Sequence, residues 1–308
     1  MYKFVLKRLA MMLPVVLGVL FVIFTLTYLT PGDPAKIMLG EQARDEDIQA
    51  LRKEMGLDNP FLVQFGNYIW KTVQLDFGVS YTTKRPVAKE ILDRFPTTML
   101  LAGLSVIIAM AIGIPLGIVC STKQYSIFDN LATVLGLLGV SIPSFWLGMM
   151  FIILFSVKLG WLPASGFYGP TYWILPALTI GMWSAAIVMR MTRSSMLEVI
   201  RQDYIRTARA KGQKESTVIM RHALKNALIP VITVVGLQFG NLLAGAIFIE
   251  SVFSIPGIGK YMVDSIKSRD YPIIQGGVML IAIVFSFVNL LVDILYAYVD
   301  PRIKSQYK

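Results

Sequence analysis

The sequence predicts an all-α membrane protein with six transmembrane helices. Two compositional features point to this class: 55% of the 308 residues are hydrophobic, and only 16% are charged. An average soluble domain carries roughly a quarter charged residues. The third observation is that the charges leave six long gaps. A soluble core can hide one or two such stretches, but six would leave this chain little polar surface to face water.

Each gap is long enough to cross a bilayer, because about 20 helical residues rise through a hydrocarbon core about 30 Å thick. The uncharged stretches are Leu9–Thr30, Phe95–Thr122, Asn130–Val157, Leu159–Met189, Asn226–Ile249 and Tyr271–Val292. The fourth stretch opens with turn-like sequence, and the sixth continues past Asp293. The predicted membrane helices therefore span about 9–30, 99–120, 131–155, 174–193, 228–249 and 273–299.

The first helix has a basic start at Lys3, Lys7 and Arg8, as a signal peptide does. However, its apolar run exceeds the 7–15 residues of a signal sequence, and no clear small-residue cleavage site follows. We interpret it as an uncleaved membrane helix.

Charge asymmetry sets the expected orientation. If both termini are cytoplasmic, the inner segments carry 16 Lys and Arg against 5 Asp and Glu. The inner segment 190–226 alone holds nine basic and three acidic residues. This is the bias of cytoplasmic loops. It accounts for the formal net charge of +10 without nucleic acid.

The predicted organisation has four parts. Residues 1–94 hold the first membrane helix and an extracytoplasmic helical segment, 31–94, and residues 95–299 form a core of five membrane helices. Within the core, 190–226 is a cytoplasmic loop, and 300–308 is a cytoplasmic tail.

The outer segment shows helical patterns. Asp45 and Asp47 can begin a helix that runs to Met55. An apolar stripe recurs at three- and four-residue steps: Phe61, Phe65, Tyr68, Ile69 and Val73. Two interpretations remain open. The stripe lies along the membrane surface or a partner, or it packs a small cap onto the helix bundle.

The inner loop contains two short amphipathic stretches separated by Gly212. Ala208, Ala210 and Gly212 are small, so another protein's backbone can approach closely. The alternative is an ordinary basic anchor for anionic lipid. That alternative explains the charge but not the helix–glycine–helix layout.

The residues for catalysis or metal binding are missing. A single cysteine, Cys120, excludes an internal disulfide and multi-cysteine metal sites, and His222 is the one histidine. The closest fragment to a P-loop is Gly259-Lys260, but Tyr261 follows where Ser or Thr is needed. We therefore expect no catalytic, metal or cofactor-binding residue in this chain, which is predicted not to be an enzyme.

Several residues within the membrane segments have predicted structural roles. Gly113-xxx-Gly117 and Gly236-xxx-Gly240 allow helices to approach closely. Pro143 can kink the third helix.

Asp293 is the one clearly intramembrane charge; such groups are often functional, but here we favour a structural role. Glu250 and Arg190 are expected at the membrane interface. An outer aromatic belt is predicted at Trp161, Tyr168, Tyr172 and Trp173.

The inner loop, DYIRTARAKG…RHALKNALIPVIT, resembles the cytoplasmic EAA loop of ABC importer permeases. It is most similar to the B-type subunit of the dipeptide/oligopeptide/nickel permease family. Segments along nearly the whole chain share this resemblance: MGLDNPFLVQFGNYIW, LDFGVS, RPVAKEILDRFPTT, SIPSFWLG, LGWLPASG, LPALTIG, ESVFSIPGIGKYMVDSIKSRDYPIIQG and DPRI. Arg206 and Thr207 replace the glutamate and first alanine of the general importer pattern, and Pro230 arrives late. The RTARAKG form is that of the peptide branch.

The resemblance implies a type I ABC importer permease fold in a bacterial or archaeal cytoplasmic membrane. It implies ATP-driven import of di- or oligopeptides delivered by an extracytoplasmic binding protein; glutathione and nickel or other metal chelates are alternative cargoes. The implied partners are a second, C-type permease and two cytoplasmic ATPases, which bind the ATP and Mg. The implied ATPase-coupling residues are Asp203, Tyr204, Arg206, Thr207, Ala208, Arg209, Ala210, Lys211 and Gly212.

Two other classes remain open. An ion-coupled secondary transporter predicts several buried ionisable groups or unwound half-helices, and the sequence offers Asp293 alone. A membrane scaffold that only docks partners predicts no substrate flux.

Overall fold

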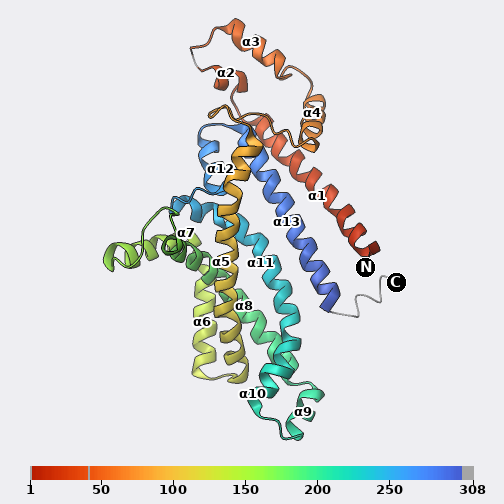
Figure 1. Cartoon of the computed structure of the whole chain (residues 1–308), viewed down its shortest axis with the longest axis vertical. Coiled ribbons are helices and arrows are strands. Elements are labelled where there is room, and N and C mark those ends of the chain that lie inside the picture. The colour runs from red at the N-terminus through yellow and green to blue at the C-terminus, as the bar shows by residue number, and fades with distance from the viewer. Residues whose placement is uncertain (1, 41, 300–308) are drawn as a thin grey trace.

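The computed structural model describes residues 2–40 and 42–299, and the predicted tail 300–308 lies outside them. The described residues form helices and one isolated antiparallel bridge, between Val79 and Pro86. Most of the long helices run roughly along the long axis of the molecule (Figure 1). They are α1 (Tyr2–Leu29), α5 (Val87–Thr122), α8 (Pro170–Ile200), α11 (Leu224–Val252) and α13 (Tyr271–Val299).

Five of the described helices are long and apolar enough to cross a membrane. The predicted third helix corresponds to two helical segments that together are apolar enough for one further span. They are α6 (Ile127–Ser141) and the continuous pair α7 (Ser144–Phe151) and η1 (Ile152–Lys158), and the bend between the two segments is 103°. The all-α membrane fold is therefore confirmed. The predicted third helix, 131–155, is not continuous. Ile142 is extended (ψ 125°) before Pro143, because proline disfavours helical geometry in the preceding residue and lacks an N–H.

Helix α5 begins at Val87 rather than near residue 99, so part of the predicted outer segment continues into the membrane helix. Val87 and Ile91 are buried there against Ile258 and Met262 of α12 (Ile258–Lys267) and Ile273 of α13. This packing explains why the helix extends beyond its uncharged stretch.

Both predicted glycine pairs lie where helices approach closely. At Gly117, an added Cβ would lie 2.5 Å from Thr192 Cβ and 2.7 Å from the Met189 carbonyl oxygen of α8. At Gly240, it would lie 2.3 Å from the ring of Phe285 on α13. The small residues thus set the α5–α8 and α11–α13 contacts, as close packing in membranes requires.

Replacing Gly113 by Ala is expected to destabilise the α5–α8 contact by about 1–3 kcal/mol, the usual range for overpacking. The new methyl group would lie 2.7 Å from the Ala185 carbonyl oxygen and 2.8 Å from Val188 Cβ. The matched control is Gly103→Ala on the same helix, where no atom lies within 4 Å. Thermal unfolding in detergent measures the difference. Equal midpoints for the two variants would contradict this account of the packing.

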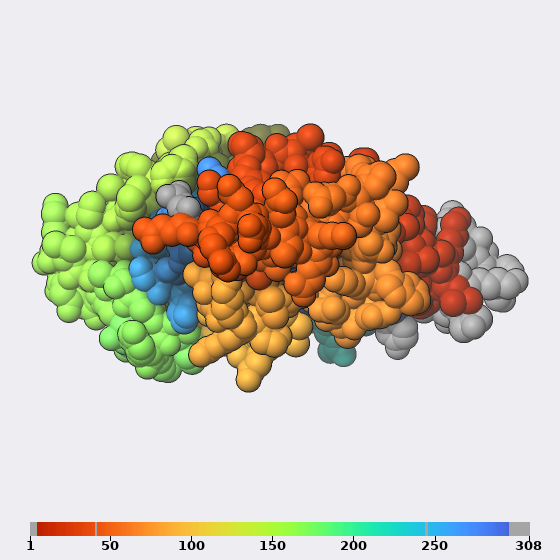
Figure 2. Space-filling view, turned by 90° about the horizontal axis from the view of Figure 1, so that it is seen from above, coloured from red at the N-terminus to blue at the C-terminus, as the bar shows by residue number. Residues whose placement is uncertain are grey.

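The cap segment, defined here as residues 31–86, covers one end of the bundle (Figures 1 and 2). It holds α2 (Pro34–Leu39), α3 (Asp45–Glu54) and α4 (Phe61–Val73). The predicted helix to Met55 is confirmed, since α3 ends at Glu54 with Met55 as its C-cap.

The cap is attached to α1 through aromatic rings. Phe65 of α4 lies 5.5 Å from Phe21 and 5.4 Å from Phe24, and Tyr68 stacks on Phe24 at 5.4 Å between ring centroids. Burial raises the pKa of Tyr68 to about 12. Part of the predicted apolar stripe therefore packs on the bundle, whereas Val73 is exposed.

The end of the cap is fixed by Asp270, which is buried immediately before α13. Its carboxylate accepts hydrogen bonds from the Ser80 hydroxyl and from the backbone N–H groups of Tyr81 (3.1 Å) and Thr82 (3.2 Å). Burial, followed by the Asp270 charge, raises the pKa of Tyr81. These contacts join the cap to the membrane helix more than 180 residues later in the chain.

Candidate functional site

The predicted coupling residues lie on and after α9 (Asp203–Ala210), at the end of the bundle opposite to the cap (Figure 1). Two α9 side chains, Ile205 and Ala208, are buried. They pack with Met196 of α8 and with Val218 and Ile219 of the π-helical segment η2 (Val218–Ala223). This small core attaches α9 to two membrane helices, because η2 continues directly into α11.

The opposite face of α9 is open. At 100° per residue, Asp203, Thr207 and Ala210 point away from the side that carries Ile205 and Ala208, and all three are exposed. Thr207 and Ala210 are small, so a partner surface can contact the helix closely. Of the predicted coupling residues, Ala208 is buried and packs α9 onto the bundle. The other predicted residues are exposed on the surface.

The loop after α9 is held by polar contacts. Gly212 adopts φ +74°, which an L-residue rarely adopts, and it ends the helix there. Arg209 binds Glu215 through two hydrogen bonds of 2.7 and 3.0 Å, and these raise the pKa of Arg209. Asn226 Nδ2 donates to the Tyr204 hydroxyl at 2.7 Å. The helix–glycine–helix layout is therefore a defined connection between α9 and the start of α11.

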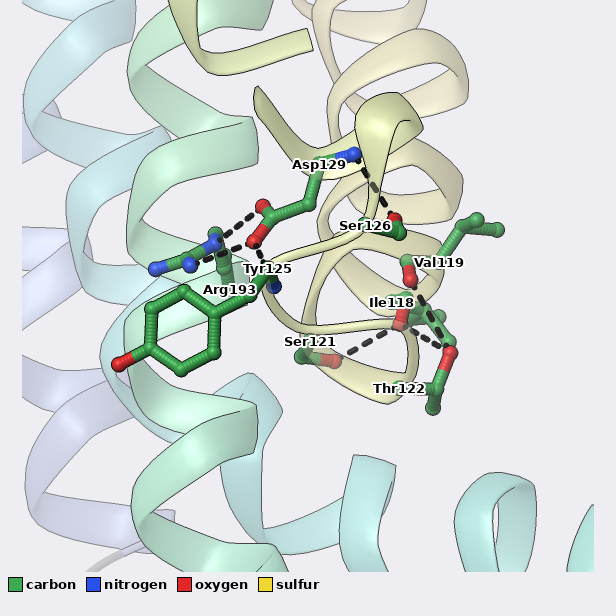
Figure 3. A network of polar contacts seen from close by, with 8 residues as sticks. All are labelled: Ile118, Val119, Ser121, Thr122, Tyr125, Ser126, Asp129 and Arg193. Carbon is green, nitrogen blue, oxygen red and sulfur yellow. Dashed lines mark hydrogen bonds and ion pairs between the residues drawn. The ribbon is translucent and has the colours of Figure 1, made fainter. Parts of the chain in front are cut away.

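A partly buried ion pair between α6 and α8 was not predicted from the sequence. Arg193 donates from Nε to Asp129 Oδ1 (2.7 Å) and from Nη2 to Oδ2 (2.8 Å), as Figure 3 shows. The side chains are 26% and 2% exposed. Asp129 Oδ2 also accepts the Tyr125 N–H at 3.0 Å, and Ser126 caps α6 by accepting the Asp129 N–H. The sequence signal was Ser126-xx-Asp129, a helix-start pattern.

Asp293, the predicted intramembrane charge, pairs with Arg8 of α1 at 3.0 Å. The contact joins the first and last membrane helices. A paired charge between helices agrees with the structural role favoured from the sequence, since charges within membranes pair or face water.

Glu250, which was expected at the membrane interface, is enclosed by other helices near the end of α11. The residue is 0% exposed. Oε1 accepts from the Thr98 hydroxyl (2.6 Å), and Oε2 accepts from the Lys260 N–H (3.0 Å). The Thr98 oxygen in turn accepts the Ile258 N–H at 2.9 Å. Sequence reasoning missed this because the donors come from α5 and from the start of α12.

The ionisable residues of the described ranges form no cluster of three or more His, Cys, Asp or Glu suited to a metal ion. Cys120 is a buried free thiol, and His222 Nε2 lies 2.7 Å from Gln213 Oε1.

Comparison with known proteins decides the family. Residues 113–305 match the family described as "Binding-protein-dependent transport system inner membrane component", and residues 1–102 match its N-terminal counterpart. The chain belongs to this family of membrane transport components. It is thus a multi-pass protein of the cytoplasmic membrane and a permease subunit.

Curated relatives match this permease along its whole length. It is 44% identical to the dipeptide transport system permease protein DppB of Alkalihalophilus pseudofirmus, over 99% of this chain and 100% of that protein. It is 45% identical to the glutathione transport system permease protein GsiC of Salmonella typhimurium, over 99% of each chain. The predicted resemblance to B-type peptide permeases is confirmed.

Solved structures share the fold of the permease. An inward-facing form of the MetNI methionine ABC transporter matches with a TM-score of 0.55 at 18% identity, covering 66% of this chain and 93% of that one. A second match, an amino acid ABC transporter, has a TM-score of 0.51 at 15% identity, covering 70% and 94%. The fold is that of ABC importer permeases.

Proposed function

We propose that this permease forms half of the membrane channel of an ATP-driven importer for di- or oligopeptides. The observation that carries the proposal is full-length identity of 43–45% to permeases named for dipeptide and glutathione transport. Glutathione is itself a small peptide. The shared chemistry of the two cargoes is a short chain of amide groups with charged ends, and glutathione is the second candidate cargo.

The partners follow from this assignment. A second, C-type permease completes the channel, two cytoplasmic ATPases bind ATP and Mg, and an extracytoplasmic binding protein delivers the peptide. The attachment of α9 supports its role as the ATPase-coupling site. Because Ile205 and Ala208 are packed against α8 and η2, a force applied to the exposed face of α9 is transmitted to both helices.

Coupling then needs two packings of the bundle, one favoured by ATP-bound ATPases and by the loaded binding protein. The three buried carboxylates described above do not favour the ion-coupled alternative. Asp129, Glu250 and Asp270 each lie at or beside a helix end and accept hydrogen bonds that join separate segments of the chain.

The test is reconstitution. The permease, purified in mild detergent with the subunits that accompany it, is placed in proteoliposomes with its binding protein. We expect ATP-dependent uptake of a radiolabelled dipeptide, and glutathione is supplied in a parallel assay. Mass spectrometry of the purified complex identifies the partners. Uptake driven by a proton or sodium gradient without ATP, or no flux with the full partner set, would reject the proposal.

A further inference from the structure

A cavity of about 290 Å³ lies at the break between α6 and α7. Its walls are the break itself (residues 140–144), Ile180 and Trp183 of α8, and Asn241 and Leu242 of α11. These residues take no part in the small core beneath α9 or in the hydrogen bonds around Glu250.

The cavity lies at membrane depth. With a rise of 1.5 Å per residue, Ser141 is about 20 Å along α6 from Ile127, and Asn241 is about 20 Å along α11 from Leu228. Both helices start at the end of the bundle that carries α9 (Figure 1), so Ser141 and Asn241 lie at similar distances from that end. The hydrocarbon core is about 30 Å thick, which places the cavity inside it.

This face is unsuited to lipid. Ser141 and Pro143 are exposed at a point where the helix is interrupted, and Asn241 is an exposed amide on the neighbouring helix. Irregular backbone at membrane depth is tolerated only where protein covers it or where it lines a water-filled cavity. An exposed amide in hydrocarbon carries the same penalty, because its hydrogen bonds to water are lost.

Hydrogen bonds hold the asparagine side chain in place. Asn241 Nδ2 donates to Gln238 Oε1 at 3.1 Å, and Gln238 Nε2 lies 3.4 Å from the Ser184 hydroxyl. Gln238 and Ser184 are buried between α11 and α8. Among the hydrogen bonds of the described residues, none engages Asn241 Oδ1. The arrangement therefore fixes one amide nitrogen and leaves one oxygen acceptor at the cavity wall.

We infer that this cavity is a substrate-contact site on the translocation path, where Asn241 Oδ1 accepts a hydrogen bond from a peptide N–H and Trp183 provides an apolar wall. The inference rests on the proposed function for the class of cargo. A neutral acceptor suits this task, because a transported molecule must bind well enough to enter and weakly enough to leave. A discontinuous helix near the substrate is also how other transporter classes form such sites.

Cysteine accessibility tests the site in the assembled complex. The background is Cys120→Ser, which removes the one native thiol of this chain. Asn241→Cys is compared with Val22→Cys, an exposed position on α1 about 10 Å from its cap end. The probe is a charged, membrane-impermeant methanethiosulfonate, and its attachment to this chain is read by mass spectrometry.

We expect the Asn241→Cys variant to react at least about tenfold faster than Val22→Cys, because charged reagents reach water-lined positions and not lipid-facing ones. Dipeptide, supplied with binding protein and ATP, is expected to slow the reaction. Equal rates for the two positions would show lipid or a dry protein contact at Asn241 and would overturn the assignment. A fast reaction that dipeptide leaves unchanged would overturn the substrate contact.

Uptake separates this inference from the proposed function. Asn241→Leu is expected to lower dipeptide uptake about tenfold, equivalent to about 1.4 kcal/mol, with normal assembly and binding-protein-stimulated ATP hydrolysis. Asn241→Gln, which keeps an amide oxygen, is expected to restore part of the uptake. If the Asn241→Leu variant takes up dipeptide at the wild-type rate, the substrate-contact site is rejected and the proposed function is not affected. Absent dipeptide uptake by the unmodified complex contradicts the proposed cargo, while the accessibility result still reports whether the cavity is wet.

Discussion

Ala210→Trp is expected to lower transport at least about tenfold while the permease still folds and inserts. Ala210 lies on the exposed face of α9, on the opposite side from Ile205 and Ala208, so the larger side chain meets no atom of the small core beneath the helix. A tryptophan there would separate α9 from the ATPase by several ångströms. Since each 1.4 kcal/mol of lost contact is a factor of ten, we expect uptake and ATPase co-purification to fall at least about tenfold.

The control is Ala210→Ser at the same position, which keeps the surface flat and is expected to transport normally. Gly212→Trp also adds bulk next to α9, but its effect would combine the lost ATPase contact with backbone strain. Gly212 has φ +74°, where a residue with a Cβ adds backbone strain of about 1–2 kcal/mol. If Ala210→Trp co-purifies with the ATPase and imports dipeptide at the normal rate, α9 is not the coupling element.

Arg193→Met is expected to destabilise the permease by about 3 kcal/mol. The substitution removes both Arg193 donors from Asp129 and leaves a carboxylate that is 2% exposed without its ion-pair partner. Breaking a buried pair by removing one partner typically costs this much, because the remaining charge is uncompensated. We expect the unfolding midpoint to fall by about 5 °C.

The chain contains its own reporter for this measurement. Cys120 is buried in α5 and is the one cysteine of the sequence, so a thiol-reactive dye detects its exposure as the protein unfolds. The double variant Arg193→Met with Asp129→Leu should recover much of the loss, since replacing both partners by apolar groups is often neutral. An unchanged midpoint for Arg193→Met, or a double variant less stable than the single one, would show that the pair does not hold α6 to α8.

The amphipathic and uncharged patterns were sufficient to predict most of the helices. A helix that faces lipid needs a long uncharged stretch, and a helix that packs through Gly113 and Gly117 needs small residues four apart. Both are local properties of the chain. The helix proposed to couple to the ATPase was also predicted locally, because Val199, Ile200, Tyr204, Ile205 and Ala208 were expected near one face and Gly212 follows; of the last three, Tyr204 is exposed. The family resemblance added its partners and cargo, which no pattern of residues indicates.

Contacts between segments that are distant in the sequence could not be predicted from these local patterns. Glu250 looked interfacial because it ends an apolar stretch, yet residues from α5 and α12 surround it. Asp129 immediately precedes an uncharged stretch and received no predicted role, yet Arg193 reaches it from α8. The sequence next to Glu250 and Asp129 does not indicate that either side chain is buried. Their burial depends on which helices pack together around them.

The sequence by itself determined that this protein spans the membrane as a helical bundle and that a short amphipathic helix follows the fourth span, because hydropathy and periodicity are written in consecutive residues. Tertiary structure alone decided that the third span breaks by 103° at Pro143 and that Asn241 stands beside that break. Proline permits many outcomes, from a mild kink to a complete turn, and only packing against α8 and α11 selects one of them.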